Sequence, residues 1–508
     1  MHLTEKMDIV SEYYEKLGFY RNPFETNTAE REPEIEKYVV RPPYLDPIED
    51  ASKHTGSYTL SGSRGSGKSA TRITVHRNIL NSSLPHKLPI ALTNFEKMRG
   101  VRKTSDLLDS FAKQIFFLTI EACLIYLTSL DSEATEERLS SFDNDSKRFI
   151  DWAINNYYLN RPQNERDVSA QECFDTFSVS FARQSKLWAE KRWDAITASL
   201  ISIADAIAKR FNVELGDAEQ YKKLLSSNNS PENIISDPLF TLKKAVEFSR
   251  IMGFSGLLVQ VDKIDETDWT TNDAETAAKL VWPIFSNVQL HEIDGLSWSF
   301  FLWDRVRGYL INEYHMPVRW DKLPNDKIKW DAKHLQRLVE RRINFFSNGA
   351  LNKISELFDD ATIESNVYQQ ILALSGLSPR ILVTVINNIL TDHIHAHEGI
   401  VTPLNMQAVH NGLDNYAKIS ILNDYSPDTI AQLKKLNRIT FVTKDVAKAF
   451  SIGQQGARQK IEKWISSGLA RRNGQVHAGD RVKPVDEFII SEPRAKRVVE
   501  RDLDIYTD

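Results

Sequence analysis

One eight-residue stretch, residues 62–69, constrains the fold of this 508-residue chain more than any other segment. Its sequence is Gly-Ser-Arg-Gly-Ser-Gly-Lys-Ser, which fits the phosphate-loop pattern G-x-x-x-x-G-K-[ST]. Residues 57–60 before it are typical of a short strand, and residues 70–80 after it are typical of a helix. Glycines let backbone N–H groups turn toward an anion, and a following helix adds the positive end of its dipole. The stretch therefore predicts a loop that binds a nucleoside triphosphate.

Each position of this loop has an expected role toward ATP and Mg²⁺. The Lys68 ammonium would reach the β- and γ-phosphates, and the Ser69 hydroxyl would ligate Mg²⁺. A chance Gly/Ser-rich loop is the alternative, but the chain has only 20 glycines, which makes a chance match rare. The residues expected to bind the nucleotide are Gly62, Ser63, Arg64, Gly65, Ser66, Gly67, Lys68 and Ser69.

The composition is that of a soluble globular protein, with 41% hydrophobic and 26% charged residues. Two cysteines, Cys123 and Cys173, supply neither a disulfide framework nor a zinc ligand set, which fits a cytoplasmic protein. The first twenty residues carry acids and no apolar core, so no secretory signal is expected. The apolar run 115–130 is short for a bilayer span and is expected to be a buried helix.

A phosphate loop needs a second element, an acid at the end of a buried strand. Residues 256–262, Gly-Leu-Leu-Val-Gln-Val-Asp, predict a strand covered on both faces that ends in Asp262. Asp262 is the expected acid on the Mg²⁺ side, and Asp265 or Glu266 would orient the attacking water. Capping of the next helix is the alternative for Asp265 and Glu266.

Three further strands, expected at 88–95, 296–304 and 317–323, would complete an α/β sheet whose ligand lies beyond the strand carboxyl ends. Asp304 would then lie near the γ-phosphate, and a surface turn residue is an equal alternative. From residue 328 to about 418 the pattern is helical. There Pro379 suits a first helical turn and leaves Arg380 near a helix start, from which it could swing toward a phosphate.

About 160 residues separate the second strand from the acidic strand, far more than an ordinary connection. Helices near 105–130 and 237–251 are expected to pack on the sheet, and helical stretches are also expected at 145–158 and 169–210. The conspicuous aromatic residues of this insertion are Trp152, Tyr157, Tyr158, Trp188 and Trp193. They are expected to pack internally, and a docking surface for a partner protein is the alternative.

The charge is unevenly distributed. The whole chain has a net charge of −5, but residues 438–484 carry ten Lys or Arg against three acids, a local excess of +7 (10 − 3). A helix at 443–450, a turn, a helix at 454–467 and strands at 469–472 and 481–490 around Asn473-Gly474 predict a winged helix-turn-helix. The expected contacts to duplex DNA are Gln454, Gln455, Arg458, Gln459, Lys463, Arg471, Arg472 and Arg481. A protein-interaction module is the alternative.

Taken in order, these parts resemble AAA+ ATPases of the origin-recognition initiator type, including their bacterial relatives. The resemblance rests on a pre-loop segment (residues 22–24 and 29–32), the phosphate loop, the two acidic strand ends, Ser378-Pro379-Arg380 and the basic C-terminal module. It covers most of the chain except residues 130–250. It implies that Asp304 is the sensor-1 position, that Arg380 is the sensor-2 arginine, and that Arg305 or Arg307 is an arginine finger in an oligomer. A plain surface role is the alternative for Arg305 and Arg307.

The fold that the resemblance implies is an α/β, P-loop AAA+ parallel sheet with a helical lid, a helical insertion and a C-terminal winged helix. The expected domains are a lead-in segment 1–55, a core 56–327 with the insertion at about 130–240, a lid 328–424, a winged helix 425–492 and a tail 493–508.

The function that the resemblance implies is ATP hydrolysis coupled to duplex DNA binding, in bacterial DNA maintenance or antiviral (antiphage) defence. The family usually has an acid directly after the metal-side aspartate, whereas this chain has Lys263. The order Asp262-Lys263-Ile264-Asp265-Glu266 is similar to that of STAND signalling NTPases, which predicts slow hydrolysis. The alternative function is therefore a STAND-like switch that senses a partner and recruits an effector through the helical insertion.

Overall fold

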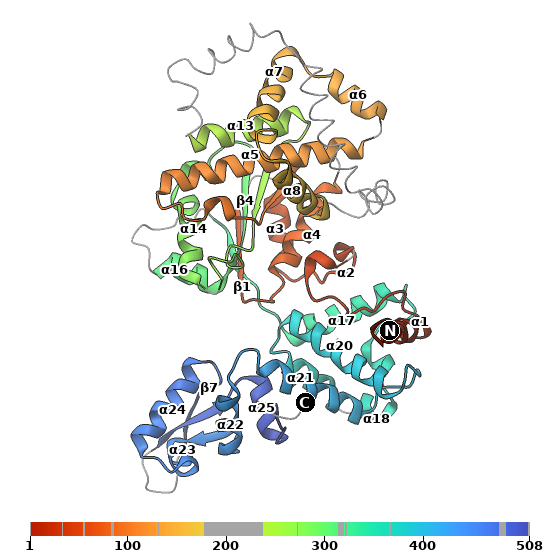
Figure 1. The fold of residues 1–508 in the computed structure, drawn as a ribbon, viewed down its shortest axis with the longest axis vertical. Coiled ribbons are helices and arrows are strands. Elements are labelled where there is room, and N and C mark those ends of the chain that lie inside the picture. The colour runs from red at the N-terminus through yellow and green to blue at the C-terminus, as the bar shows by residue number, and fades with distance from the viewer. Residues whose placement is uncertain are drawn as a thin grey trace. The chain divides into compact units, whose positions relative to one another are not determined.

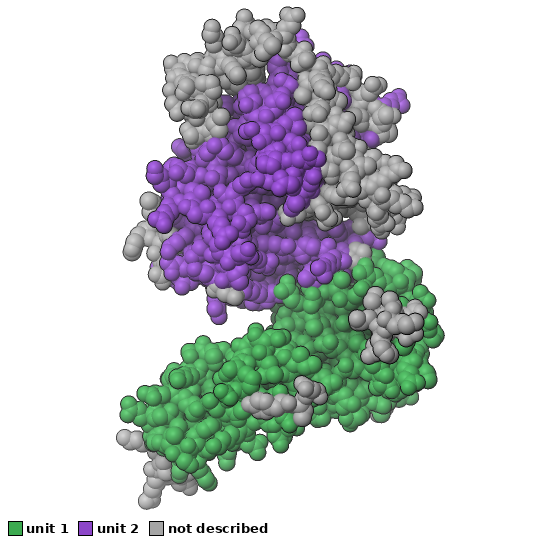
Figure 2. Space-filling view, viewed as in Figure 1, with its two compact units in different colours: residues 1–27, 330–508 green, residues 28–329 purple. Residues whose placement is uncertain are grey.

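The computed structural model describes residues 2–32, 34–53, 56–82, 86–130, 132–176, 237–271, 273–312, 320, 323–364, 367–476 and 484–505. The chain divides into two compact units, shown in separate colours in Figure 2. Unit 1 comprises residues 1–27 and 330–508, and unit 2 comprises residues 28–329. The predicted lead-in segment, residues 1–55, therefore contributes to both units.

Unit 2 is built on a five-stranded parallel sheet with the strand order β2-β3-β4-β1-β5 (Figure 1). The strands are β1 Tyr58–Gly62, β2 Lys87–Leu92, β3 Gly256–Val261, β4 Leu296–Trp303 and β5 Asn325–Lys327. Every residue of β1, β3 and β4 is buried, as expected for a parallel sheet covered on both faces. This order sets β4 between β1 and β3, so the phosphate loop and both acidic strand ends emerge at one edge of the sheet.

Helices cover this sheet, and a lead-in of short helices precedes it. Within the described residues, the α-helices of unit 2 are α2 Ile35–Tyr38, α3 Leu45–Lys53, α4 Lys68–Leu80, α5 Thr104–Ser129, α6 Ser132–Ser140, α7 Asn144–Ala153, α8 Gln163–Thr176, α13 Pro238–Ile251, α14 Ala274–Ser286, α15 Val288–His291 and α16 Asp304–Asn312. Single turns of other helix types are η1 Ala29–Arg31, η2 Glu96–Met98 and η3 Ile154–Tyr158. The α/β parallel sheet that the sequence predicts is thus present.

The fifth strand of the sheet is Asn325–Lys327, which pairs with β1 and was not predicted. Of the strand predicted at 317–323, the two described residues, Trp320 and Leu323, lie outside any strand. Three polar residues at a sheet edge carry no run of apolar side chains, so hydrophobic patterning gives them no signal. Residues 317–319, 321 and 322 lie outside the described residues.

Helix α5 is the apolar helix that the sequence analysis expected to be buried. By length and hydropathy Thr104–Leu127 could cross a bilayer, but 83% of its most apolar window is buried inside the protein. It packs against α13 and β2, with Phe116 and Phe248 in edge-to-face contact. Such burial is typical of the core helix of a water-soluble domain.

The aromatic residues of the insertion that the structure describes pack internally, as expected. The Trp152 ring stacks on Phe149, and the Tyr158 ring stacks on Phe117 of α5. Tyr157 lies 4.4 Å, centroid to centroid, from Phe116. These contacts leave Trp152, Tyr157 and Tyr158 as part of the core of unit 2. Trp188 and Trp193 lie outside the described residues.

Unit 1 is helical in its first part and ends in a small mixed module. Its helices are α1 His2–Lys16, α17 Ala332–Phe346, η4 Ile354–Leu357, α18 Asp360–Glu364, α19 Val367–Leu374, α20 Pro379–Ala396, α21 Met406–Ile421, α22 Pro427–Leu436, α23 Thr443–Phe450, α24 Gln454–Ser466 and α25 Pro493–Glu500. Its strands β6 Thr440–Val442, β7 Ala470–Val476 and β8 Val485–Ile490 form an antiparallel sheet of order β6-β8-β7.

The end of the chain differs from expectation in two respects. Asn473-Gly474 does not form the hairpin turn, because β7 continues to Val476 and Gly474, at φ +115°, forms an irregularity in its pairing with β8. Residues 493–508, predicted as a tail, contain helix α25. Two arginines of this C-terminal segment, Arg497 and Arg501, bond the two carboxylate oxygens of Asp414 on α21, at 2.6 and 2.8 Å.

We predict that Asp414→Ala lowers the stability of unit 1 by about 3 kcal/mol, because it leaves the buried Arg497 guanidinium without its carboxylate. Urea unfolding measures the change. Asp424→Ala is the control, since Asp424 also pairs with an arginine, Arg494, but its side chain is 58% exposed. Loss of this carboxylate should cost less than about 1 kcal/mol, because it is exposed and Arg494 keeps its pair with Glu492. Equal losses of unfolding free energy in the two variants would contradict the assignment of Asp414 as the essential partner of the buried Arg497.

Candidate nucleotide-binding site

The phosphate loop joins β1 to α4 and has a backbone that only glycine adopts easily. Gly65 and Gly67 have φ angles of +73° and +95°, in the left-handed region. A Cβ on Gly62 would lie 2.5 Å from the Ser66 hydroxyl oxygen, so the loop also needs glycine there. The N-cap of α4 is Gly67, which has no side chain to bond the first N–H groups of the helix, as is typical of loops that bind an anion there.

Lys68 is the first residue of α4, and its ammonium lies against the loop. Its Nζ donates to the carbonyl oxygens of Gly62 and Ser63, both at 3.1 Å. Burial lowers the pKa of Lys68, while the charges of nearby carboxylates raise it. These carboxylates are Asp262, Asp265, Glu266 and Asp304. All four acids that the sequence analysis selected therefore lie near enough to this lysine for their charges to act on it.

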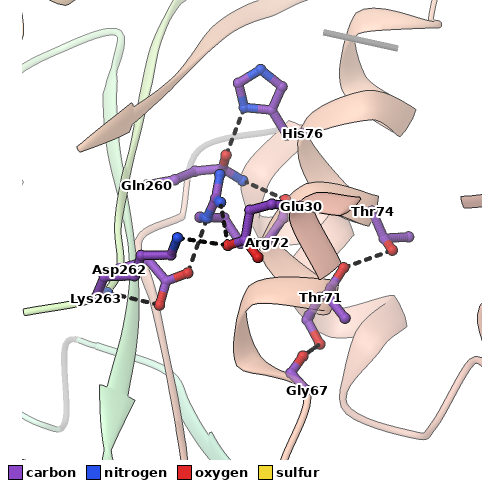
Figure 3. A network of polar contacts seen from close by, with 10 residues as sticks. Glu30, Gly67, Thr71, Arg72, Thr74, His76, Gln260, Asp262 and Lys263 are labelled. Carbon is purple, nitrogen blue, oxygen red and sulfur yellow. Dashed lines mark hydrogen bonds and ion pairs between the residues drawn. The ribbon is translucent and has the colours of Figure 1, made fainter. Parts of the chain in front are cut away.

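Asp262 directly follows β3 and is buried, with 1% of its surface exposed. Its Oδ1 accepts a hydrogen bond from the Lys263 backbone N–H at 2.9 Å. Its Oδ2 accepts one from Nε of Arg72, at 3.0 Å (Figure 3). Arg72 comes from α4, one turn after Lys68, and is itself 3% exposed. This buried ion pair was not predicted, because helix patterning places an arginine on a solvent face.

The pre-loop segment contributes one more acid to this network. Glu30 of η1 lies 2.8 Å from Nζ of Lys263 and 3.8 Å from a guanidinium nitrogen of Arg72. Burial raises the pKa of Glu30, but its bond to Lys263 and the two positive charges lower it overall. Lys263 has a φ of +62°, an uncommon backbone state for a lysine. Glu30 and Lys263 were both quoted from the sequence, but their contact was not foreseen.

A neutral pair ties α4 to β3 beside these charges. Nδ1 of His76 lies 2.8 Å from Oε1 of Gln260, and the Gln260 amide donates to the Arg72 carbonyl (Figure 3). Burial lowers the pKa of His76 to about 3, so the ring is neutral at physiological pH. The pair fixes α4 relative to β3 without adding charge to the site.

Asp265 and Glu266 lie in different surroundings. Asp265 is buried and accepts a bond from Nε of Arg64 in the phosphate loop at 3.1 Å, while Arg64 also lies over the Trp303 ring. Glu266 is exposed. The helix-cap alternative for this pair is wrong, because Asp273 caps the next helix, α14.

The other predicted residues near the sheet edge contact β5 or the Trp303 ring. Asp304 is the first residue of α16, and its carboxylate lies 3.4 Å from Nζ of Lys327 on β5. Arg305 is exposed and lies over Trp303, whereas Arg307 donates to the Asn325 side chain at 2.8 Å. The finger role of either arginine stays a prediction.

Arg380 belongs to unit 1, whereas the phosphate loop belongs to unit 2. Pro379 and Arg380 form the start of α20, and the Ser378 hydroxyl accepts a bond from the Ile381 N–H at 3.4 Å. Arg380 is exposed, and among the described residues its guanidinium has no ion pair. Its approach to a phosphate stays a prediction.

The donor set fits a Mg²⁺ ion that is held largely by nucleotide phosphates. Ser69 follows Lys68 in the first turn of α4, and Asp262 supplies a buried carboxylate at the neighbouring strand end. No group of three or more His, Cys, Asp or Glu in the described part of the chain is arranged to hold a metal alone. Mg²⁺ in proteins is usually held by one or two carboxylates together with substrate phosphates.

The second predicted site lies in the C-terminal module of unit 1. Helix α24 buries Ala457, Ile461 and Trp464 against the rest of the module. Its predicted contact residues, Gln454, Gln455, Arg458, Gln459 and Lys463, are exposed, as are Arg471 and Arg472 of β7. Arg472 forms an exposed ion pair with Glu462 at 3.4 Å. Arg481 lies outside the described residues.

We predict that Gly67→Ala destabilises unit 2 by about 1–2 kcal/mol, because a Cβ disfavours the left-handed backbone at this position. Thermal unfolding without nucleotide measures this. Gly308→Ala is the control, since Gly308 lies in α16 with no atom within 4 Å of an added Cβ, and it should be neutral or slightly stabilising. An unchanged Gly67→Ala midpoint would refute the strained-loop assignment.

No protein-family model matches the chain, and no curated protein matches it. Among solved structures the chain is similar to the Drosophila ORC bound to DNA, with 13% identity and a TM-score of 0.30. That similarity covers 90% of this chain and 85% of the other. At this identity and TM-score, no property of that assembly is transferred to this protein.

Proposed function

We propose that this protein is a P-loop ATPase of the AAA+ type that couples its nucleotide state to the binding of duplex DNA. One observation carries the ATPase part: the sheet order brings Lys68, which follows β1 and two glycines with left-handed backbone, to the same edge as the four carboxylates that follow β3 and β4. A cation next to an uncapped helix start suits the phosphates, and carboxylates opposite it suit Mg²⁺ and the attacking water.

We assign the roles from the position of each residue relative to the loop and the strand ends. The loop backbone of residues 62–69 and the Lys68 ammonium bind the phosphates, and Ser69 with Asp262 holds Mg²⁺. Bound Mg²⁺ would neutralise charge that develops on the transferred phosphoryl group. Asp304 contacts the γ-phosphate side, and Arg380 reads the nucleotide from the helical region that serves as a lid.

Glu266 is the better candidate for orienting the water. Asp265 is buried and already bonded to Arg64, so its carboxylate serves to hold the phosphate loop. Glu266 is exposed and lies close enough to Lys68 to influence its pKa. Because Lys263 replaces the acid next to Asp262, turnover is slow and bound ATP acts mainly as a conformational signal.

The test of the ATPase proposal compares three variants. Lys68→Ala should weaken binding of a fluorescent ATP analogue about 100-fold, because it removes charge-assisted bonds to two phosphates. Glu266→Gln should keep the binding and lower kcat at least about 100-fold, the usual size of a lost proton acceptor. Asp265→Asn is the matched control and should retain more turnover than Glu266→Gln. Unchanged ATP affinity in well-folded Lys68→Ala would refute the proposal.

For the DNA-binding part we propose that residues 425–492 form a winged helix-turn-helix whose second helix, α24, enters the major groove. Support comes from the local charge excess and from the exposure of seven of the eight predicted contact residues. The buried face of α24 is apolar, so its polar and cationic face is directed to solvent. This is the arrangement that a recognition helix needs.

We predict that the double variant Arg458→Ala/Arg472→Ala weakens duplex DNA binding at least about tenfold and lowers the slope of log K against log salt by about 2. Mobility shifts over a range of salt concentrations measure both. The control is Lys333→Ala/Arg337→Ala, which removes the same charge from an exposed part of α17. Equal effects in the two double variants would show that only net charge matters.

The proposal extends to the setting of the protein. It includes a cytoplasmic location, a homo-oligomer in which Arg305 or Arg307 faces a neighbour's nucleotide, and a role in bacterial DNA maintenance or antiviral defence. A STAND-like switch is the second candidate, and the substitution of Lys263 for an acid favours it. DNA binding that depends on Arg458 and Arg472 distinguishes the first function from the second.

A further inference from the structure

Two carboxylates lie within reach of one buried arginine behind the phosphate loop (Figure 3). Arg72 Nε donates to Asp262 at 3.0 Å, and its Nη2 lies 3.8 Å from Oε1 of Glu30. The first contact is a hydrogen bond and the second is only a charge contact. Nη1 of Arg72 is buried and has no hydrogen-bond partner among the described residues. The Arg72 guanidinium therefore has a buried N–H donor that makes no hydrogen bond in this position.

The same pairing opposes a metal at Asp262. Both carboxylate oxygens of Asp262 accept hydrogen bonds from the protein, one of them from the Arg72 guanidinium. A positive charge this close repels a second cation strongly where water is excluded. Mg²⁺ at Asp262 and a close Arg72 are therefore in competition for one carboxylate.

Glu30 offers Arg72 a second acceptor nearby. Its carboxylate lies 36% exposed and is already positioned by Nζ of Lys263 at 2.8 Å. Glu30, Arg72 and Lys263 all line one cavity of about 470 Å³, which gives the guanidinium room to turn. A small side-chain movement would replace the Asp262 bond with a bond to Glu30 and keep the buried arginine paired.

We propose that Arg72 is a positioning residue that exchanges between Asp262 and Glu30, and that this exchange sets the Mg²⁺ affinity of the nucleotide site. The inference rests on the proposed ATPase function. When Arg72 bonds Asp262, its positive charge weakens the binding of Mg²⁺ to the Asp262 carboxylate. When Arg72 bonds Glu30 instead, the Asp262 carboxylate is free to bind the metal. Lys263, which replaces an acid of related ATPases, serves this device by holding Glu30 in place.

The alternative is that Arg72 is a static clamp between α4 and β3. If Arg72 is a clamp, substitutions of Arg72 and Glu30 lower the stability of the protein, but they do not shift the Mg²⁺ concentration needed for nucleotide binding in opposite directions. Independent charge effects are a second alternative, and under them the effects of two substitutions add. In the exchange, Glu30 acts only through Arg72. The effects of substituting Glu30 and Arg72 on Mg²⁺ affinity therefore must not add.

The experiment measures the Mg²⁺ concentration that half-saturates binding of a fluorescent ATP analogue to the full chain. Arg72→Gln should lower this concentration about tenfold, the scale of one short-range charge. Glu30→Gln should raise it by a similar factor, because Arg72 then bonds Asp262 alone. In the double variant, Glu30→Gln should have no further effect beyond that of Arg72→Gln. Unchanged or additive shifts would overturn the proposal.

Arg77→Gln is the matched control, since Arg77 is a buried arginine of the same helix that pairs with Glu36 at 2.9 Å. It should alter stability and leave the Mg²⁺ dependence as in the parent protein. If Arg72→Gln does not fold, Glu30→Gln alone still decides, because an unchanged Mg²⁺ dependence there refutes the exchange. A parent protein that binds no ATP analogue, with or without Mg²⁺, would instead refute the ATPase proposal.

Discussion

A buried ion pair, Arg72 with Asp262, connects the two parts of the candidate nucleotide site. It joins the helix that follows the phosphate loop to the strand that ends in the metal-side acid. The pair is enclosed, with side-chain exposures of 3% and 2%, so its strength depends on geometry rather than on salt. The neutral His76–Gln260 contact beside it holds α4 against β3, whichever carboxylate Arg72 bonds. The placement of Lys68 near its acids follows from that fixed position.

Around this pair, cations from the loop and its helix (Arg64, Lys68 and Arg72) lie near acids that follow the strand ends or belong to the pre-loop segment. Each buried acid has a cationic partner: Asp265 has Arg64, and Asp262 has Arg72. Glu266 differs because it is exposed. A reactive group at the site should retain access to water and substrate, and this is why Glu266 rather than Asp265 suits that role.

The sequence predicted the parts of the fold that leave a local signal. The apolar runs before Asp262 and Asp304 gave β3 and β4, and the glycine pattern gave the loop. The polar strand β5 and the three-residue strand β6 have no such runs, and Gly474 looked like a turn because a Gly after Asn usually is one. The Arg72–Asp262 pair spans 190 positions, so no local pattern could show it. Helix α4 even buries Arg72, His76 and Arg77, residues that a helix normally exposes.

Unit 1 is assembled from the two ends of the chain, with Tyr13 of α1 packed edge-on against His393 of α20. During synthesis α1 leaves the ribosome before unit 2, and its partner in unit 1 is made only after the whole of unit 2. At ordinary elongation rates this delay is on the order of 20 to 70 s. Throughout it, the apolar face of α1, which includes the buried Tyr13 and Tyr14, has no native surface to cover it. Unit 2 can fold in the meantime, so the order of translation lets unit 2, which carries the candidate nucleotide site, mature before unit 1.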